Sequence, residues 1–299
     1  MVELKVLSLK EPYASLIKEK KKLIETRSFK TNYRGELYIH ASINKSKIDN
    51  NLLELVENLD LNCGYIICKC NLVDCIYMTE EYVNNMKKNN YQEYICGEYK
   101  AGRYAWILED VEEIQPIRAK GNLNIWNYYN EFDVLDLMQD IKDGWLDKNN
   151  HKHFLDNDLF LDNYMLQTPQ EVLKNEVGVC WDQVELERYL LKNNDWNIKT
   201  YFIVHYDDIC PTHTFLTFKK NNNYYWLEHT WEKFRGIHEY SSLNELLNDV
   251  KTKFIEFELK SNYQTNKLII YEYKKPKYHI SVAEFYKHCE NGDVVNLVD

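Results

Sequence analysis

The pattern of apolar and polar positions divides the first part of the chain into short strands and short helices. Residues 3–9 alternate polar and apolar side chains, which is typical of a half-buried β-strand. Residues 10–22 instead place Tyr13, Leu16 and Ile17 at helical spacing. The same criteria predict a helix at 45–59 and further strands at 23–26, 35–40, 64–76 and 103–109.

In the second part of the chain, helices and strands follow one another more regularly. A helix is predicted to begin at about Cys180 and to end at about Leu191. Three strands, a helix, a strand and a last helix follow, at 199–206, 213–219, 223–229, 241–254, 266–273 and 281–289. Residues 131–170 are less regular, and helical spacing appears in them only at 133–141.

The length of 299 residues suggests two domains, since domains typically hold roughly 50–200 residues. We place the boundary near residue 130, which gives domains at 1–130 and 131–299. Residues 131–170 belong either to the second domain or to a lid over Cys180, and the sequence leaves both open. Strands mixed with helices in each part predict the α+β class.

Composition excludes disorder and shows that the two halves differ in charge. Hydrophobic residues make up 44% of the chain and aromatic residues 14%, which is enough for packed cores. Residues 1–130 hold 18 basic and 18 acidic side chains, whereas 131–299 hold 19 and 29. A basic cluster runs from Lys18 to Arg34, and local clusters of this kind bind phosphates. The second half has no comparable run and would repel a polyanion.

The sequence carries no signal that would direct the chain to a membrane or out of the cell. Its start lacks the apolar run of a signal peptide, and no window approaches the roughly 18 apolar residues of a membrane span. We therefore expect a cytoplasmic protein with eight mostly reduced cysteines. We predict no metal site and no cofactor, because Cys63, Cys68, Cys70 and Cys75 lie along apolar strands without CxxC spacing.

Three residues of the second half form a candidate catalytic set. Cys180 falls where a helix begins, and a helix N-terminus lowers the pKa of a thiol. His213 opens a predicted strand, and Glu228 lies on the next strand after an Asn-rich turn. Counting from that turn puts His213 and Glu228 across from each other to within one or two residues. Glu228 would then orient the imidazole, and the other ring nitrogen would face Cys180.

This order of a Cys at a helix start, a His on a strand and an acid on the next strand resembles the transglutaminase-like superfamily. The resemblance runs from about Thr168 to Phe254 and includes Gly178. It implies acyl transfer through a Cys thioester on a protein or amide substrate, with a papain-like α+β fold. The family usually has Asp where Glu228 stands. Two other arrangements stay open: Asp207 or Asp208 could orient His213, and Cys210-x-x-His213 could be half a metal site.

The first half resembles the ASCH domain, a small PUA-like β-barrel with helices. Pieces that match in order are Pro12, Tyr13 and Ala14, Lys22, Glu25, Arg27 and Ser28, Tyr33 to Gly35, His40 to Ser42, Gly102 to Trp106, Pro116 and Ile117, and Asn124 to Asn127. The resemblance implies a cleft for RNA, DNA or a nucleotide. Tyr13 and Tyr33 suit base stacking, and Lys22, Arg27 and Arg34 suit phosphates. Glu25 suits either a base edge or an internal ion pair with Arg27.

Some ASCH-like proteins resemble amidohydrolases that act on acylated cytidine with a Lys, a Thr and a Glu. Lys22 aligns with that Lys, but Glu25 stands where the Thr is expected, so we expect binding more than catalysis in this half. The sequence as a whole predicts a nucleic-acid or nucleotide module joined to a cysteine acyl-transfer enzyme. Two alternatives are a binding protein with a degenerate second domain, and a nuclease or nucleoside amidohydrolase centred on the ASCH-like half.

Overall fold

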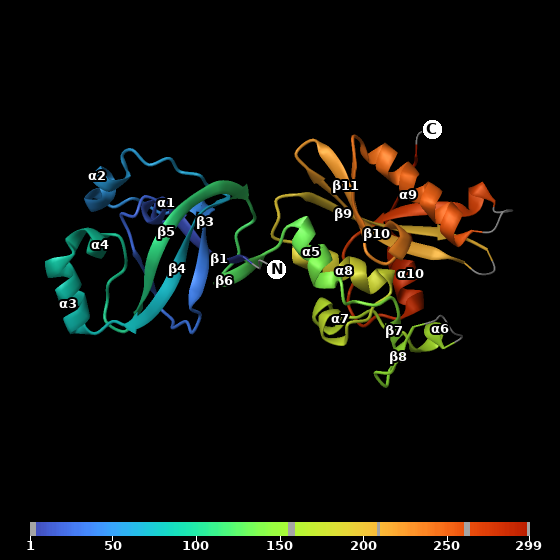
Figure 1. Cartoon of the computed structure of the whole chain (residues 1–299), viewed down its shortest axis with the longest axis horizontal. Helices are drawn as coiled ribbons and strands as arrows, with labels where there is room; N and C mark the ends of the chain where they lie inside the picture. Colours follow the sequence, from blue (N-terminus) through green and yellow to red (C-terminus); the bar gives the residue numbers. More distant parts are fainter. Residues whose placement is uncertain (1–3, 155–158, 208–209, 260–263, 298–299) are drawn as a thin grey trace. The chain divides into compact units, whose positions relative to one another are not determined.

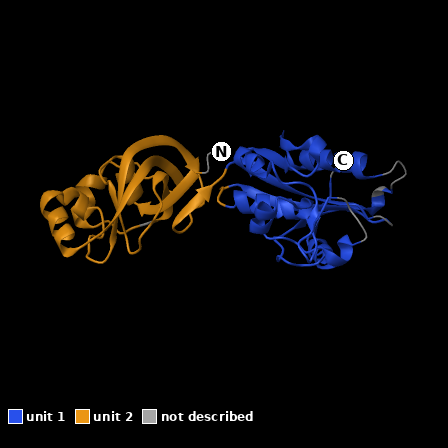
Figure 2. Ribbon diagram, turned by 60° about the horizontal axis from the view of Figure 1, so that its bottom comes forward, with its two compact units in different colours: residues 1, 130–192, 196–299 blue, residues 2–129, 193–195 orange. Residues whose placement is uncertain are grey.

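The computed structural model describes residues 4–154, 159–207, 210–259 and 264–297, and the chain separates into two compact units. Residues 2–129 and 193–195 form the N-terminal unit, which is unit 2 in Figure 2. Residues 130–192 and 196–299 form the C-terminal unit, which is unit 1 in Figure 2. Each unit holds a six-stranded sheet with helices, so the class is α+β.

The sheet of the N-terminal unit has the strand order β2-β5-β4-β3-β1-β6 (Figure 1). Strands β1 and β3 pair in parallel, and the other pairs are antiparallel. Strands β3 and β5 are longer than predicted, since β3 continues to Lys45 and β5 pairs with β4 as far as Arg118, whereas β4 has the predicted length. The bounds are β1 Leu4–Glu11, β2 Ile24–Arg27, β3 Gly35–Lys45, β4 Tyr65–Tyr77, β5 Tyr104–Arg118 and β6 Ile125–Tyr128.

Short helices accompany this sheet, and two of the predicted helices are shorter than expected. The bounds are α1 Tyr13–Lys18, η1 Asn50–Leu52, α2 Leu53–Val56, α3 Glu80–Asn89 and α4 Tyr91–Ile95. The helix predicted at 45–59 is reduced to η1 and α2, which have no side-chain caps. A helix this short is stable only through tertiary packing, and here Leu52 packs with Leu16 and Cys96.

The core of the N-terminal unit lies between α1 and the sheet. Leu7, Ile17, Ile39 and Trp106 are fully buried in one cluster with the side chains of Cys68 and Cys70. Of the four cysteines on the predicted apolar strands, Cys68 and Cys70 are thus buried in the core, whereas Cys63 and Cys75 are only partly buried. Burial raises the pKa of the Cys70 thiol to about 12, so it behaves as a small apolar residue.

The sheet of the C-terminal unit has the order β12-β11-β10-β9-β13-β14, and all its pairs are antiparallel (Figure 1). The strands are β9 Asn197–His205, β10 Thr212–Lys220, β11 Asn223–Glu228, β12 Gly236–Tyr240, β13 Leu268–Tyr273 and β14 Asp293–Val294, and a separate pair is β7 Trp145–Leu146 and β8 Lys152–His153. The strands predicted from 199 to 229 match β9, β10 and β11 to within two residues at each end.

Helices cover both faces of this sheet. Trp181 of α8 and Phe285 of α10 pack on Phe202, whereas Phe254 of α9 packs on the opposite face with Phe215. Each strand of the middle of the sheet is therefore buried on both sides, which explains its nearly continuous apolar sequence. The helices are α5 Glu131–Met138, α6 Phe160–Asn163, α7 Pro169–Asn175, α8 Cys180–Leu191, η2 Glu232–Phe234, α9 Leu243–Glu258, η3 Thr265–Lys267 and α10 Val282–Glu290.

Among the described residues, no helix combines the length and the apolar character that a membrane crossing requires.

Candidate functional site

Strands β10 and β11 bring His213 and Glu228 together. The register pairs Leu216 with Leu227, and this places Glu228 two residues along from the position opposite His213. The His213 Nε2 and the Glu228 Oε2 are 2.8 Å apart, and both side chains are about 2% exposed. The predicted juxtaposition on adjacent antiparallel strands is therefore present. Because Nε2 faces the carboxylate, Nδ1 is the ring nitrogen left for another partner.

That partner is Cys180, the first residue of α8. Its side chain is half-buried and hydrogen-bonded to the His213 ring. Burial lowers the pKa of His213, but the Glu228 charge and the hydrogen bonds to Cys180 and Glu228 outweigh burial and raise the pKa to about 10. His213 is thus an imidazolium at neutral pH, which is the form that stabilises a neighbouring thiolate.

Trp231, which the sequence analysis did not single out, completes the surroundings of His213. Its indole ring stacks on the imidazole with ring centroids 3.7 Å apart and an angle of 13° between the planes. Its backbone N–H donates to Glu228 Oε1 at 2.8 Å. One residue therefore fixes the plane of the imidazole and the orientation of the carboxylate. The only feature of the sequence that could have indicated this role is the position of Trp231, three residues after Glu228.

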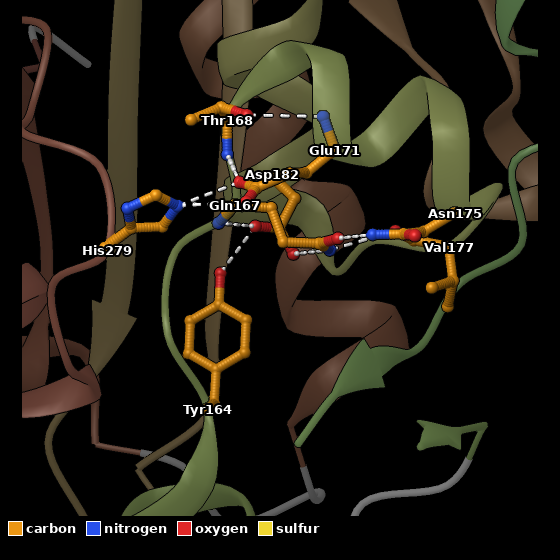
Figure 3. Close-up of polar contacts among 8 residues, drawn as sticks. All are labelled: Tyr164, Gln167, Thr168, Glu171, Asn175, Val177, Asp182 and His279. Atoms are coloured by element: carbon orange, nitrogen blue, oxygen red, sulfur yellow. Dashed lines mark hydrogen bonds and ion pairs between the residues drawn. The ribbon is translucent and has the colours of Figure 1, made fainter. Parts of the chain in front are cut away.

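A buried carboxylate, Asp182, holds the segment that leads into Cys180 (Figure 3). Its Oδ1 accepts hydrogen bonds from the Tyr164 hydroxyl at 2.9 Å and from the Gln167 backbone N–H at 2.8 Å. Its Oδ2 accepts from the Val179 N–H at 3.1 Å. Burial raises the pKa of Asp182 to about 7, while these hydrogen bonds favour the charged form. Asp182 therefore fixes Val179, the residue directly before Cys180.

The outer part of this hydrogen-bond network lies at the preceding helix, α7. Thr168 and Glu171 form a capping box at the start of α7, and Glu171 also accepts from the exposed His279 ring (Figure 3). Gln167 donates to the Val177 carbonyl at 3.0 Å and accepts from Asn175 at 3.0 Å. The loop between α7 and α8 is therefore held from both of its ends.

Gln183, one turn into α8, connects the same loop to the sheet. Its Nε2 donates to the Gly178 carbonyl at 2.7 Å, so its Oε1 is left to accept from His229 Nδ1 at 2.7 Å. Burial and the charge of Arg235 lower the pKa of His229 to about 4. His229 is therefore neutral near pH 7 and carries its proton on Nδ1.

Glu187 lies two turns after Cys180 on the same helix and is buried. Burial raises its pKa well above the ordinary value, and the negative charge of Glu228 raises it further. A neutral carboxyl group therefore stands beside the His213–Glu228 pair. The burial of Glu187 could not be predicted from the sequence, since a Glu in the middle of a helix is normally solvated.

The other partners considered for His213 were Asp207, Asp208 and a metal ion. Asp207 pairs with His205 at 3.1 Å and accepts from the Cys210 backbone N–H at 2.7 Å, so it orients a different His. Asp208 lies outside the described residues. In the part of the chain that the structure describes, no group of three or more His, Cys, Asp or Glu side chains could hold a metal ion.

The N-terminal unit has a cleft of about 630 Å³. Three of the predicted binding residues, Tyr13, Glu25 and Arg27, line it. The Arg27 Nε lies 3.0 Å from Glu25 Oε1, and its guanidinium lies 5.9 Å from the centre of the Trp106 ring. The cleft thus offers an aromatic ring, a carboxylate and a guanidinium within one hollow. Its remaining wall is mostly polar and includes Lys10, Ser42, Asn44, Ser46, Asn122 and Asn124.

Ser8 and His40 form the floor of the cleft, and sequence reasoning did not assign them a role. The Ser8 hydroxyl lies 3.1 Å from His40 Nδ1 and accepts from Trp126 Nε1 at 3.0 Å and from the Asn122 N–H at 3.3 Å. Burial lowers the pKa of His40, so it is neutral. Both lone pairs of Ser8 are occupied, so we assign it to the structure of the floor rather than to nucleophilic chemistry.

Comparison with known proteins identifies this part of the chain. The family model of the ASCH domain matches residues 7–118. This segment is an ASCH domain. A crystal structure of a mutant of ZmASCH from Zymomonas mobilis is 18% identical, covers 46% of this chain and 81% of that one, and has a TM-score of 0.27. No curated protein matched the chain.

Lys22 does not line the cleft of the ASCH domain. Its side chain is only 1% exposed, and its Nζ donates to the Ile24 carbonyl and lies 3.4 Å from Glu25 Oε2. The prediction that Lys22 contacts a phosphate is wrong, because its ammonium group is buried behind Glu25. Lys22 and Arg27 instead hold the Glu25 carboxylate from two sides.

Tyr33 and Arg34 also lie outside the cleft. Arg34 pairs with Asp74 at 3.0 Å, and its guanidinium also donates to the Thr31 and Tyr33 carbonyls. Tyr33 lines a separate, smaller pocket of the ASCH domain. The six predicted binding residues are thus divided among the cleft, the layer behind it, a second pocket and a surface ion pair.

Proposed function

We propose that the C-terminal unit is a cysteine-dependent acyl-transfer enzyme. The observation that carries this proposal is His213, which is buried, faces Glu228 with one nitrogen and is hydrogen-bonded to Cys180. A nucleophile, a base and an orienting acid in this order are the elements of a catalytic triad. The resemblance to the transglutaminase-like superfamily supports the same chemistry.

In the proposed reaction, the Cys180 thiolate attacks the carbonyl carbon of an amide. The C–N bond of the tetrahedral intermediate then breaks, the His213 imidazolium donates its proton to the departing nitrogen, and a Cys180 thioester remains. Neutral His213 next takes a proton from water or an amine as it attacks the thioester. The second step releases an acid or a new amide and restores the Cys180 thiolate and the His213 imidazolium.

The first turn of α8 supplies donors for the oxyanion of this intermediate. Val179, at the N-cap position, has an apolar side chain and makes no side-chain cap hydrogen bond to the N–H groups of the first turn. The Cys180 backbone N–H therefore suits one of the two oxyanion contacts, assisted by the positive end of the helix.

Alkylation of Cys180 by iodoacetamide, followed by mass spectrometry, tests the proposal. An ordinary thiol has a pKa of about 8.5 and reacts slowly at pH 6. We expect Cys180 to react selectively at pH 6, and His213→Ala to slow this reaction at least tenfold. His279→Ala, which removes an exposed His, is the matched control.

Alkylation of Cys180 at the rate of the other seven cysteines, or no dependence on His213, would rule the proposal out. Selective reactivity would justify a screen of amide and peptide substrates against wild type and Cys180→Ala. An activity that survives Cys180→Ala and is lost in Lys22→Ala would move catalysis to the ASCH domain.

We further propose that the ASCH domain binds a nucleotide or nucleic acid in its cleft. The cleft volume of about 630 Å³ accommodates a nucleotide. Tyr13 can stack on a base, Arg27 can contact a phosphate and Glu25 can accept from a base edge. The match to the ASCH family supports this assignment.

Binding of labelled oligonucleotides, followed by fluorescence anisotropy, tests the second proposal. Arg27→Ala should weaken binding by about tenfold and reduce its salt dependence, because one phosphate contact is removed. Lys88→Ala, which removes an exposed cation of α3 outside the cleft, is the matched control. Equal effects of the two substitutions would show that the cleft is not the binding site.

A further inference from the structure

A second hollow of about 290 Å³ adjoins the cleft of the ASCH domain. Asn124 lines both hollows, and the aromatic residues of the second are Phe29, Tyr33 and Trp106. Asn124 has a left-handed backbone with φ of 59°, a conformation that Asn tolerates, and the chain bends there between the two hollows. The shared residue makes them neighbouring parts of one surface.

The second hollow presents an aromatic ring held in a fixed position. Phe29 is 41% exposed, and it packs edge to face on Trp106 with centroids 5.7 Å apart and an angle of 84°. Trp106 is buried and donates from Nε1 to the Phe29 carbonyl at 3.4 Å. Trp106 therefore fixes both the ring and the backbone of Phe29, whose exposed part suits stacking on a base.

Cationic and amide groups surround this ring. The exposed Lys30 lies directly after Phe29, and Lys5, whose Nζ donates to Asn127 Oδ1 at 2.9 Å, also lines the second hollow. Arg27 lines the adjoining first hollow. An aromatic platform accompanied by cations is the arrangement that binds single strands without sequence preference.

We propose that the second hollow receives the base next to the one bound in the cleft, so that the ligand is a single-stranded oligonucleotide. This inference rests on the proposed nucleotide binding by the cleft. Two bases in separate hollows on either side of Asn124 cannot be stacked on each other or paired in a duplex. The ASCH domain should therefore prefer a dinucleotide to a mononucleotide, and a single strand to a duplex.

Calorimetric titration of the full chain with uridine monophosphate, the dinucleotide UpU, oligo-U and an RNA duplex tests this proposal. We expect UpU to bind about tenfold more tightly than the monophosphate. Phe29→Ala should remove this advantage and leave monophosphate binding unchanged, since stacking contributes about tenfold per base. Phe29→Tyr, which keeps the ring, should restore it, and Phe132→Ala, at an exposed Phe in the other unit, is the matched control.

Equal affinities of the monophosphate and UpU would overturn the second base site and leave the proposed function of the cleft standing. Loss of monophosphate binding in Phe29→Ala, with the fold intact by circular dichroism, would also overturn it. Duplex binding as tight as oligo-U binding would contradict the single-stranded ligand. If none of the four ligands bound, the proposed nucleotide binding would fail as well.

Discussion

The residues around Cys180 act through a few strong interactions in a buried setting. His213 is charged because the Glu228 carboxylate is close and both groups are shielded from water. In such surroundings an ion pair interacts more strongly than at the surface, and removal of one partner leaves the other uncompensated. Trp231 and Asp182 keep the geometry of Cys180, His213 and Glu228, although neither belongs to the proposed triad.

Glu228→Gln should lower the pKa of His213 from about 10 to below its ordinary value of about 6.5. The substitution removes the attractive charge, while burial continues to disfavour the imidazolium. Alkylation of Cys180 between pH 6 and 8 should therefore slow at least tenfold, and NMR titration of the imidazole should show the shift. Glu232→Gln, at an exposed position of η2, is the control. An unchanged His213 titration would contradict the assignment of Glu228.

Among the elements, α8 carries the site, and its start depends on the loop before it. Val177, Gly178 and Val179 are held by Gln167, Gln183 and Asp182 in turn. A Cβ at Gly178 would lie 2.8 Å from the Cβ of Asp182 and 3.5 Å from a methyl group of Val172. Glycine is therefore needed here because of close approach.

Gly178→Ala should destabilise the fold by about 1–3 kcal/mol, since the added methyl group forces Asp182 or the loop to move. The same movement should displace Cys180 and slow its alkylation at pH 6. Urea unfolding monitored by tryptophan fluorescence gives the change in stability. A variant with the unfolding midpoint of the wild type would show that the loop relaxes without cost.

At the scale of the whole molecule, the two halves differ in charge. Residues 1–130 have no net charge, so the affinity of the ASCH domain for an anionic ligand depends on where Arg27, Lys5 and Lys30 lie. Residues 131–299 have a net charge of −10. Long-range attraction therefore contributes little to ligand binding, and local contacts must supply the affinity.

Stability should fall as the pH decreases from 6.5 to 4, in part because of His229. Its pKa is about 4 in the folded state and about 6.5 when unfolded, so the unfolded state binds the proton more readily in this range. The contribution of His229 to the free energy of unfolding is fully present above pH 6.5. Roughly 3 kcal/mol of it is lost at pH 4. Urea unfolding at pH 7 and pH 5 should show a smaller loss for His229→Gln than for the wild type.

His279→Gln, at an exposed His, should lose as much stability as the wild type over the same range. An equal loss in His229→Gln would contradict the assignment. His213 acts in the opposite sense, because its raised pKa contributes stability that is full below pH 6.5 and is lost as the pH rises through about 10.

Local sequence pattern was enough to predict the elements around Cys180, His213 and Glu228. Strand alternation and helical spacing are local properties, so β9 to β11, α8 and the pairing of His213 with Glu228 followed from counting along the chain. The ASCH segment was also recognisable, because its matching residues are spread in order over 7–118.

The directions of individual side chains depended on contacts formed in the folded chain. The helical pattern of 10–22 includes Lys22, which we predicted to contact a phosphate, whereas the helix ends at Lys18 and Lys22 is buried against Glu25. Arg34 forms an ion pair with Asp74 on β4, and the Trp231 ring stacks on His213. These outcomes depend on residues distant in sequence, and competition between such partners leaves no mark in local periodicity.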